Sequence, residues 1–488
     1  MQNTTLKPSL GRWLIGLTAC FFLVHGLYYL VGVRFNDRTL IEVMHFLDPV
    51  LLKTRLLESV WYLHIQPPLF NLFVGLVLKV TPESPWLFYA LYVACGLCLY
   101  LNTFVLQVRL GVERRLAAVL STVFMASPSF ILWEQFLMYT MPIAALLSVA
   151  AVCLLGYLES RRVLPLAGFF LAIFLLCGMR SMFHIGYYIL LFGVLVGLGK
   201  GYRRQIVTVA LVPFLVLFGF YFKNYVLFGE FNVCSFTEKN LWIMTAGNMP
   251  WDEKNKLVEE GKISELSLVN RWASLDAYDF KYKVVPERFK KVRALSRTHK
   301  TNDAVNYNHY GFIENCNEYG ADAKYVLLHQ PKHFLISTVQ SWYRYFKSSS
   351  ALPISPENQQ HIRPLIAFYD HVLYGKVPFD FSKHSRLIEM TGTPPYLFLL
   401  LGLPLVLLYG VYRALRPGAT PLTSAHRGVL LFMGFTIFMV AALGCTFDYL
   451  ETARYRFTTD GLSLVLLGVF VQHGLDGWRR RGGDAVGD

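Results

Sequence analysis

The chain of 488 residues is 54% hydrophobic and only 16% charged, whereas a soluble domain carries about 25% charged residues. Several apolar runs reach about 20 residues, the length that crosses the hydrocarbon core of a bilayer, so the composition excludes a soluble enzyme and indicates an all-α polytopic membrane protein. The net charge of +14 does not point to nucleic acid, because the basic residues gather in short loops between apolar runs, as they do on the cytoplasmic side of a membrane.

The first predicted membrane span covers residues 11–33. It is too long for the apolar region of a signal peptide and lacks a small-residue cleavage site, so we expect it to remain as a span. Residues 34–66 follow as the first outer loop, whose apolar and charged residues recur at helical spacing and predict a helix lying in the membrane interface. Pro49 would end or kink that helix. Asp37, near its start, is either its N-terminal cap or a functional carboxylate.

The stretch WYLHIQPPLFN places two adjacent prolines before a short apolar run. Because proline is tolerated in the first turn of a helix, Pro67 and Pro68 predict the start of a helix over 67–80. Its N-terminus would bring free N–H groups and partial positive charge to the outer face, where an anionic group could bind. A rigid turn without a ligand is the alternative. His64 and Gln66 stand at this threshold as candidate binding residues.

Ten apolar runs are long enough to be membrane spans, and residues 67–80 form a shorter eleventh candidate. The Arg-rich loops and both termini all fall on the cytoplasmic side if segment 67–80 enters the membrane without crossing it. We therefore expect a bundle of about ten or eleven helices. The ten runs cover 11–33, 86–107, 116–133, 137–158, 163–179, 183–199, 206–222, 394–412, 428–447 and 458–475.

The outer loops of this topology carry an unusual set of polar residues beside apolar runs. Acids, amides and arginines next to lipid normally face a cavity or a water-filled path, and arginine forks can pair with a phosphate. Each of them alone could also be a solvated surface group. The candidates are Glu134 and Gln135, Arg180 and His184, and a late group of Asp448, Glu451, Arg454 and Arg456.

A long polar insert interrupts the apolar runs. Apolar residues at three- and four-residue steps in AKYVLLHQPKHFLISTVQSWYRYF predict helices there, so we expect a mostly helical extracytoplasmic domain. Its two cysteines, Cys234 and Cys316, could form a disulfide in an oxidising compartment. The predicted parts of the chain are a bundle over 1–222, the insert over 223–393, C-terminal membrane helices over 394–478 and a cytoplasmic tail over 479–488.

Five motifs occur in a recognisable order along the whole chain. Asp37 follows the first span, HIQPPLF begins the short apolar run, and SPSFILWEQFLMYTMP joins two spans. KNYVLFGEF precedes the insert, and ETARYRF precedes the last span. This arrangement resembles the GT-C class of integral membrane glycosyltransferases. Within that class the chain resembles the bacterial proteins grouped with the protein O-mannosyltransferases and with the aminoarabinose transferases of lipid A.

The resemblance implies a GT-C-like fold and an enzyme of the bacterial inner membrane with its active site on the extracytoplasmic side. Such enzymes move a sugar from a polyprenyl-phosphate donor to an acceptor hydroxyl with inversion, and Asp37 would be the general base. The residues expected at the donor phosphate are His64, Arg180, Arg454 and Arg456. Those expected at the sugar or the acceptor are Gln66, Glu134, His184 and Glu451, of which Glu134 and Glu451 could instead pair with the arginines.

The chain departs from both branches at two positions. Gln66 stands where the aminoarabinose transferases have a lysine that meets the carrier phosphate, and Asp37 is followed by Arg38 rather than by a second acid. The resemblance therefore assigns neither branch, and the acceptor can be a glycan, a lipid or a protein. No cofactor is certain from the sequence; a divalent metal stays open, because carboxylates abound but none has the spacing of a magnesium or manganese site.

Two other classes of function fit part of the pattern. A transporter or flippase of a polyprenyl-linked envelope precursor would also be basic and carry outer arginines, but the sequence has no internal inverted repeat of the kind found in many transporters. A scaffold for envelope assembly would explain the spans but not Asp37 together with the Pro-Pro threshold.

Overall fold

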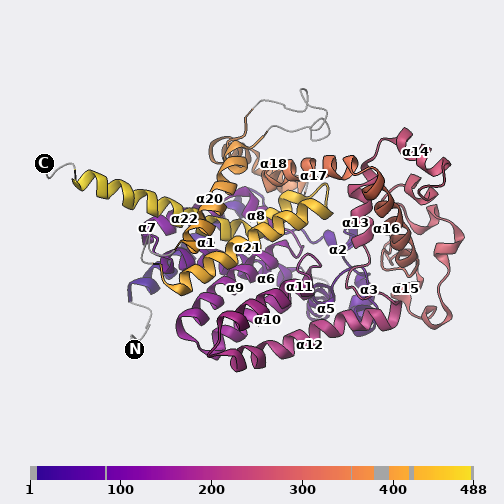
Figure 1. Ribbon diagram of the computed structural model, residues 1–488, viewed down its shortest axis with the longest axis horizontal. Coiled ribbons are helices and arrows are strands. Elements are labelled where there is room, and N and C mark those ends of the chain that lie inside the picture. Colours follow the sequence, from indigo (N-terminus) through magenta and orange to yellow (C-terminus); the bar gives the residue numbers. More distant parts are fainter. Residues whose placement is uncertain (1–7, 83–84, 353, 378–394, 417–421, 485–488) are drawn as a thin grey trace.

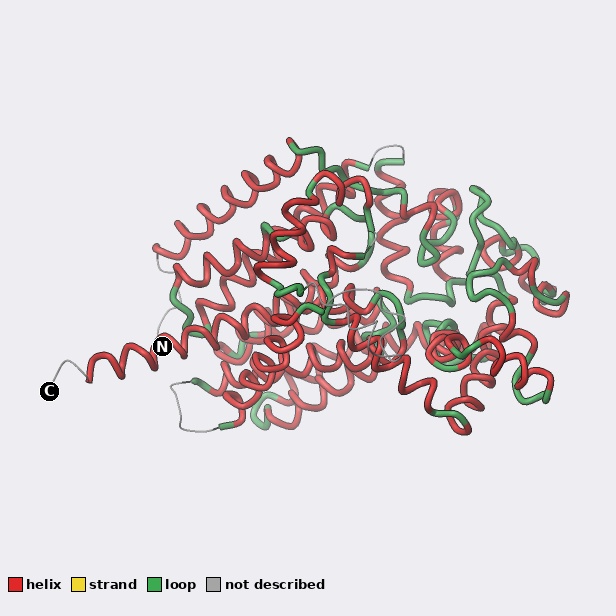
Figure 2. Tube along the Cα trace, turned by 90° about the horizontal axis from the view of Figure 1, so that it is seen from above, coloured by secondary structure: helices red, strands yellow, loops and turns green. Residues whose placement is uncertain are grey.

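The computed structural model describes residues 8–82, 85–352, 354–377, 395–416 and 422–484. Within these ranges the chain forms helices, turns and three isolated bridges but no strand, as Figure 2 makes plain. The predicted all-α fold is therefore confirmed. Some residues of each predicted part lie outside the described residues: 1–7 and 83–84 of the bundle, 353 and 378–393 of the insert, 394 and 417–421 of the C-terminal membrane helices, and 485–488 of the tail.

The membrane part is a bundle in which α9 is central. It packs against α6, α10, α21 and α22, and α12 in turn packs against α10 and α11. The helices of the bundle are α1 (Pro8–Leu30), α5 (Pro68–Val80), α6 (Trp86–Arg109), α7 (Arg114–Met125), α8 (Pro128–Glu134), α9 (Thr140–Ser160), α10 (Val163–Met179), α11 (Ile185–Leu198), α12 (Arg203–Phe228), α20 (Leu397–Leu415), α21 (Ser424–Phe447) and α22 (Thr452–Asp484).

Six described helices are long and apolar enough to cross a membrane, and the bent pair α7 and α8 could make a seventh. The polytopic membrane fold is therefore confirmed, with fewer full-length spans than the ten predicted. The remaining predicted runs coincide with shorter helices: α5 has 13 residues, α10 has 17 and α11 has 14. At 1.5 Å per residue α5 is only about 20 Å long, shorter than a hydrocarbon core of about 30 Å. The last run, 458–475, lies within α22, whose first turns are polar.

The bend between α7 and α8 has a local cause. The two helices meet at 59° across Ala126 and Ser127, where the sequence predicts one straight span over 116–133. Pro128 has no N–H to continue the helical hydrogen bonds, and the Ser127 hydroxyl instead caps the new helix by accepting from the Phe130 amide at 3.2 Å. The chain therefore changes direction before α8, whose last residue is Glu134.

The first outer loop is three short helices rather than one interfacial helix. They are α2 (Thr39–Glu42), α3 (Pro49–Thr54) and α4 (Leu56–Trp61). As expected, Pro49 breaks the pattern, because it begins α3 with Asp48 as its side-chain cap, accepting from the Val50 amide at 2.9 Å. Of the two roles left open for Asp37, that of a helix cap is excluded, because Arg38 is the N-cap residue of α2 and no side chain caps that helix.

The insert gathers at one end of the bundle, away from the end where α22 projects (Figure 1). Its helices α13 and α17 pack on α21, and α17 also packs on α22. Cys234 and Cys316 are both buried and unbonded, so the disulfide that the sequence allows is not formed. The α-helices are α13 (Thr237–Met244), α14 (Trp251–Glu259), α15 (Arg293–Ser296), α16 (Gly311–His329), α17 (Lys332–Tyr345), α18 (Pro356–His361) and α19 (Arg363–Phe368).

Short turns of tighter or wider helix join these elements. The 3-10 turns are η1 (Ala246–Asn248), η2 (Glu265–Leu268), η3 (Leu275–Ala277), η4 (Phe280–Lys283), η5 (Glu287–Phe289) and η6 (Ser349–Ala351), and the single π turn is η7 (Tyr369–Leu373).

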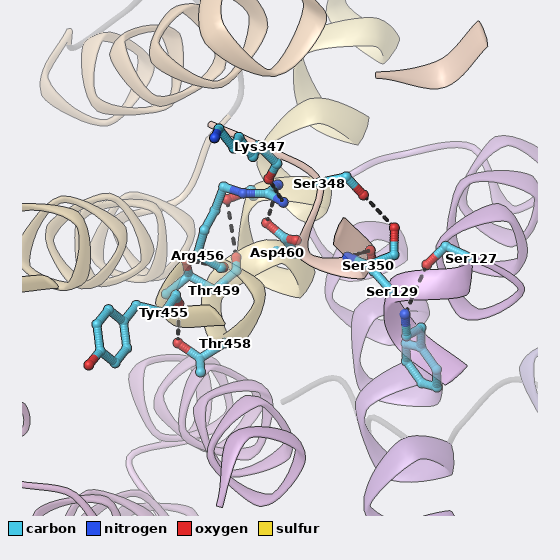
Figure 3. Close-up of polar contacts among 12 residues, drawn as sticks. Ser127, Ser129, Lys347, Ser348, Ser350, Tyr455, Arg456, Thr458, Thr459 and Asp460 are labelled. Carbon is cyan, nitrogen blue, oxygen red and sulfur yellow. Dashed lines mark hydrogen bonds and ion pairs between the residues drawn. The ribbon is translucent and has the colours of Figure 1, made fainter. Parts of the chain in front are cut away.

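A polar junction fastens the insert to the bundle just after α17 (Figure 3). The buried Arg456 guanidinium pairs with Asp460 one turn further along α22 at 3.1 Å and donates to the Lys347 carbonyl at 2.9 Å. The neighbouring Ser350 amide donates to the Ser129 hydroxyl of α8 at 3.2 Å. The chain leaving α17 is thereby held against both α22 and α8.

This junction predicts a coupled loss of stability. Arg456→Met leaves the Asp460 carboxylate in a buried site without its cation, which costs about 3–5 kcal/mol for a buried pair. We expect a lower apparent midpoint of thermal unfolding in detergent, and a partial recovery in the double variant Arg456→Met/Asp460→Asn, because the orphaned charge is then gone. A double variant less stable than Arg456→Met would contradict the assigned pair.

Candidate functional site: a polar cavity between bundle and insert

A cavity of about 1170 Å³ lies where the first outer loop, the bundle and the insert meet. Asp37, Gln66, Arg180, Glu451 and Arg454 all line it. Five of the nine site residues expected from the sequence therefore share one chamber, although they come from segments more than 400 residues apart along the chain.

The cavity has a defined position along the helices. Helix α10 begins just after Arg162 and ends just before Arg180, and α21, with Arg427 in its first turn, ends just before Asp448. Arg180 and Asp448 line the cavity, so the cavity lies at the ends of these helices opposite to their basic loops.

Two guanidinium groups share two tyrosine rings in the wall formed by the bundle. Arg180 lies over the rings of Tyr139 and Tyr455 with its central carbon 4.7 and 5.3 Å from their centroids, and Arg454 lies at 5.6 and 5.3 Å from the same two. Arg180 also donates to both phenolic oxygens, to that of Tyr455 at 2.7 Å. Cation–π attraction helps to hold the two like charges close together.

The compensation of these charges is incomplete. Arg454 pairs with Glu451 at 2.7 Å, and the Tyr455 hydroxyl donates to the Asp448 carboxylate at 2.5 Å. Arg180, in contrast, has only phenolic hydroxyls as hydrogen-bond partners within the described chain. Arg454 is 4% exposed, and its Nε has no partner there. Since guanidinium donors prefer anionic acceptors, this wall can take a negatively charged group.

Asp37 is positioned by the backbone on either side of it. The Asn36 amide donates to the Gln135 carbonyl at 2.7 Å, and the Leu137 amide donates to the Asn36 carbonyl at 3.0 Å. The Thr39 hydroxyl donates to the Leu137 carbonyl at 2.8 Å. The Asp37 carboxylate itself, half-buried, makes no hydrogen bond or ion pair with any described residue. It is therefore an available proton acceptor in a fixed place.

Gln66 meets a histidine that the sequence did not single out. Its amide donates to Nδ1 of His45 at 2.9 Å, and His45 also lines the cavity. Burial, together with the nearby Arg180 and Arg454, holds the pKa of His45 well below its ordinary value, which keeps Nδ1 free to accept. The carbonyl oxygen of Gln66 is buried without a partner, so one acceptor remains for a ligand.

Four expected site residues do not line the cavity. The Nε2 of His64 donates to the Asn308 carbonyl at 3.1 Å, and its Nδ1 accepts from the Ser235 hydroxyl at 2.8 Å. His184 caps α11 by accepting from the Gly186 amide at 3.1 Å. Arg456 belongs to the junction with Asp460. Each of the three meets protein partners and does not line the chamber, so the structure does not bring them together with Arg180 and Gln66.

Glu134 is the fourth, and it is paired inside the bundle. Its carboxylate lies 2.6 Å from Nε2 of His25 in α1, while Nδ1 of that ring lies 2.7 Å from the Phe21 carbonyl. Because a carbonyl only accepts, Nδ1 carries a proton and the His25–Glu134 contact shares one more. The other carboxylate oxygen fills the notch left by Gly96, where a Cβ would stand 1.8 Å away. A histidine inside a predicted span was the signal for this pair.

Other residues in or next to the chamber left little signal in the sequence. Tyr139 and Tyr455 are ordinary aromatic residues beside spans, and Arg271 is one of many basic residues in the insert. Among the described residues no group of three or more His, Cys, Asp or Glu side chains is arranged to hold a metal ion.

Comparison with known proteins gave no relative. No family model, no curated protein and no solved structure matches this chain. Fold and site geometry are therefore the grounds on which a function can be argued.

The burial of His64 predicts a stability that depends on pH. Burial lowers the pKa of His64 from 6.5 to about 3, so between these values the unfolded chain binds a proton that the folded chain does not. Acidification below pH 6.5 therefore lowers the free energy of unfolding by up to about 1.4 kcal/mol per pH unit. His64→Gln lowers the apparent unfolding midpoint at pH 7.5 through lost hydrogen bonds.

The difference in midpoint between His64→Gln and the parent protein should shrink from pH 6.5 to pH 4, because the variant lacks the titrating group. A difference that stays constant over this range would contradict the assignment. The exposed His329, replaced in the same way, serves as the control.

Proposed function

We propose that this protein is an inverting glycosyltransferase of the bacterial inner membrane, which moves a sugar from a polyprenyl-phosphate donor to an acceptor hydroxyl at the outer face. The observation that carries the proposal is the unpaired carboxylate of Asp37 in the same cavity as Arg180 and Arg454. A base and a phosphate-binding wall are the two parts that such a transfer requires. The order of the motifs along the chain, which resembles that of the GT-C class, also supports the proposal.

The reaction follows from these two parts. Asp37 takes the proton of the acceptor hydroxyl as that oxygen forms its bond to the anomeric carbon of the sugar. The bond from this carbon to the phosphate oxygen breaks on the opposite side, and the polyprenyl phosphate leaves with the electron pair. A phosphate is already a stable leaving group, so no acid has to protonate it. Asp37 would then return its proton to water.

The arginine wall supplies the electrostatic part. Negative charge grows on the phosphate as the bond breaks, and guanidinium groups fixed before the reaction stabilise it without reorganising. Arg180 would contribute most, since only tyrosine hydroxyls accept its hydrogen bonds. The buried carbonyl of Gln66 would accept from a sugar or acceptor hydroxyl, and Glu451 would hold Arg454. The position of the cavity, at the helix ends opposite to the basic loops, supports an extracytoplasmic site.

Asp37→Asn tests the base. The substitution keeps the size of the side chain but removes the proton acceptor, so we expect turnover to fall by about 10²–10⁴ while a polyprenyl-phosphate lipid still co-purifies. Mass spectrometry of the co-purifying lipids identifies the donor, and transfer of its sugar measures turnover. The exposed Asp252 in α14, changed to Asn, is the matched control.

Unchanged turnover in Asp37→Asn would remove Asp37 as the base, and the absence of any polyprenyl-linked lipid would remove the donor class. A flippase of a polyprenyl-linked precursor would instead move the lipid across a proteoliposome membrane without sugar transfer, and Asp37→Asn would leave that movement intact.

Arg180→Gln tests the phosphate-binding wall. Loss of the guanidinium should weaken binding of a synthetic polyprenyl phosphate by at least about tenfold, the size of one charge-assisted hydrogen bond. Binding is measured in nanodiscs by native mass spectrometry. Arg162→Gln, at the other end of α10, should bind as the parent does; equal weakening in both variants would point to non-specific charge effects.

A further inference from the structure

A single arginine of the insert faces the cavity without a partner. Arg271 lines the chamber, and its guanidinium makes no hydrogen bond, ion pair or ring contact with any described residue. Its Nη1 is enclosed and unsatisfied, which costs free energy unless something else pairs with it. The other arginines of the chamber, each with a protein partner, are Arg34, Arg38, Arg180 and Arg454.

The backbone around Arg271 is fixed. The Trp272 amide donates to the Asn270 side chain at 2.9 Å, and the Tyr307 hydroxyl donates to the Trp272 carbonyl at 2.8 Å. The Tyr278 hydroxyl reaches the Asn270 carbonyl at 3.4 Å. The backbone that carries Arg271 is therefore in place before any ligand arrives.

The neighbours of Arg271 are cationic and aromatic. Burial lowers its pKa and the nearby Arg344 adds to this, while Tyr449 acts in the opposite sense. Lys254, only 7% exposed, is close enough that the positive charge of Arg271 helps to lower its pKa. Arg344 donates to the Tyr449 carbonyl at 2.8 Å and lies over its ring. Positive charge gathered in this way, with an unused donor, favours an anion.

We propose that Arg271 forms a second anion subsite in the cavity, which takes a phosphate or carboxylate group separate from the leaving phosphate of the donor. The subsite is second to the site of the donor's leaving phosphate, so this inference rests on the proposed function. The subsite has its own residues: Arg271 lies near Arg344 and Tyr449, whereas Arg180 and Arg454 share Tyr139 and Tyr455. Trp272 is 44% exposed beside it and offers an apolar face for the body of the ligand.

The chemistry names two sources for this group. It is carried either by the acceptor, approaching over the insert, or by the carrier as a second phosphate. A guanidinium fork binds both phosphate and carboxylate through paired N–H···O bonds, and both sources would explain an unpaired arginine in the same cavity as Asp37.

The test is protection of Arg271 from an arginine-selective dicarbonyl reagent, read by peptide mass spectrometry on the full-length protein in nanodiscs. We expect inorganic phosphate to slow labelling of Arg271 severalfold. The exposed Arg293 of the same insert, outside the chamber, is the internal control and should label at the same rate throughout. Equal labelling of Arg271 with and without phosphate would overturn the subsite, and no variant has to fold for this result.

Two further experiments follow. The first separates the Arg271 subsite from the donor phosphate site, and the second separates the carrier from the acceptor as the source of the anion. In Arg180→Gln, protection of Arg271 by phosphate should persist; its loss would mean one anion site and overturn the inference. With synthetic polyprenyl phosphate and diphosphate as probes, protection of Arg271 by the diphosphate alone assigns the group to the carrier. Protection by inorganic phosphate but by neither lipid assigns it to the acceptor. All these readouts are independent of turnover, so inactivity or activity of Asp37→Asn leaves them unchanged.

A variant gives a second measure of the same site. Phosphate should raise the apparent unfolding midpoint of the parent, and in Arg271→Gln the half-saturating phosphate concentration for this subsite should rise about tenfold. Arg293→Gln should titrate as the parent does. An Arg271→Gln titration equal to that of Arg293→Gln would overturn the proposal.

Discussion

The structure depends on two guanidinium groups, the buried Arg454 and the partly buried Arg180, that stand side by side without full compensation. Like charges repel strongly in a medium of low dielectric constant, and Arg180 and Arg454 are kept together by the faces of Tyr139 and Tyr455 and by Glu451. The arrangement needs the end of α10, the approach to α9 and the start of α22 to meet at one level. The positions of those three helix ends therefore fix the chamber.

The placement of the carboxylate follows from the same constraint. A carboxylate in contact with Arg180 would be neutralised and would become a poor proton acceptor. Asp37 is instead held by backbone bonds between its neighbours and the segment after Glu134, so that it shares the chamber without pairing. In the proposed reaction this separation of charge allows the base and the phosphate wall to act on the two ends of one bond.

Much of the polar chemistry around the chamber holds the protein together. His64 joins the first loop to the insert, and Arg456 joins α22 to the chain after α17. The His25–Glu134 pair joins α1 to α8. Buried polar groups must be hydrogen-bonded wherever they stand. A residue type suited to binding a ligand is for that reason equally suited to binding another part of the chain, and sequence spacing does not distinguish the two uses.

The sequence by itself determined the membrane bundle, the helical insert, the break at Pro49 and the helix start at Pro68, because apolar length and proline chemistry act locally. It also singled out Asp37, Arg180 and Arg454, since charge beside an apolar run is costly unless it faces a cavity. Only the tertiary structure separated these from His64, Glu134, His184 and Arg456, and only it brought in His45, Tyr139 and Arg271. Which buried polar groups find protein partners depends on contacts between segments hundreds of residues apart, and no local pattern encodes those contacts.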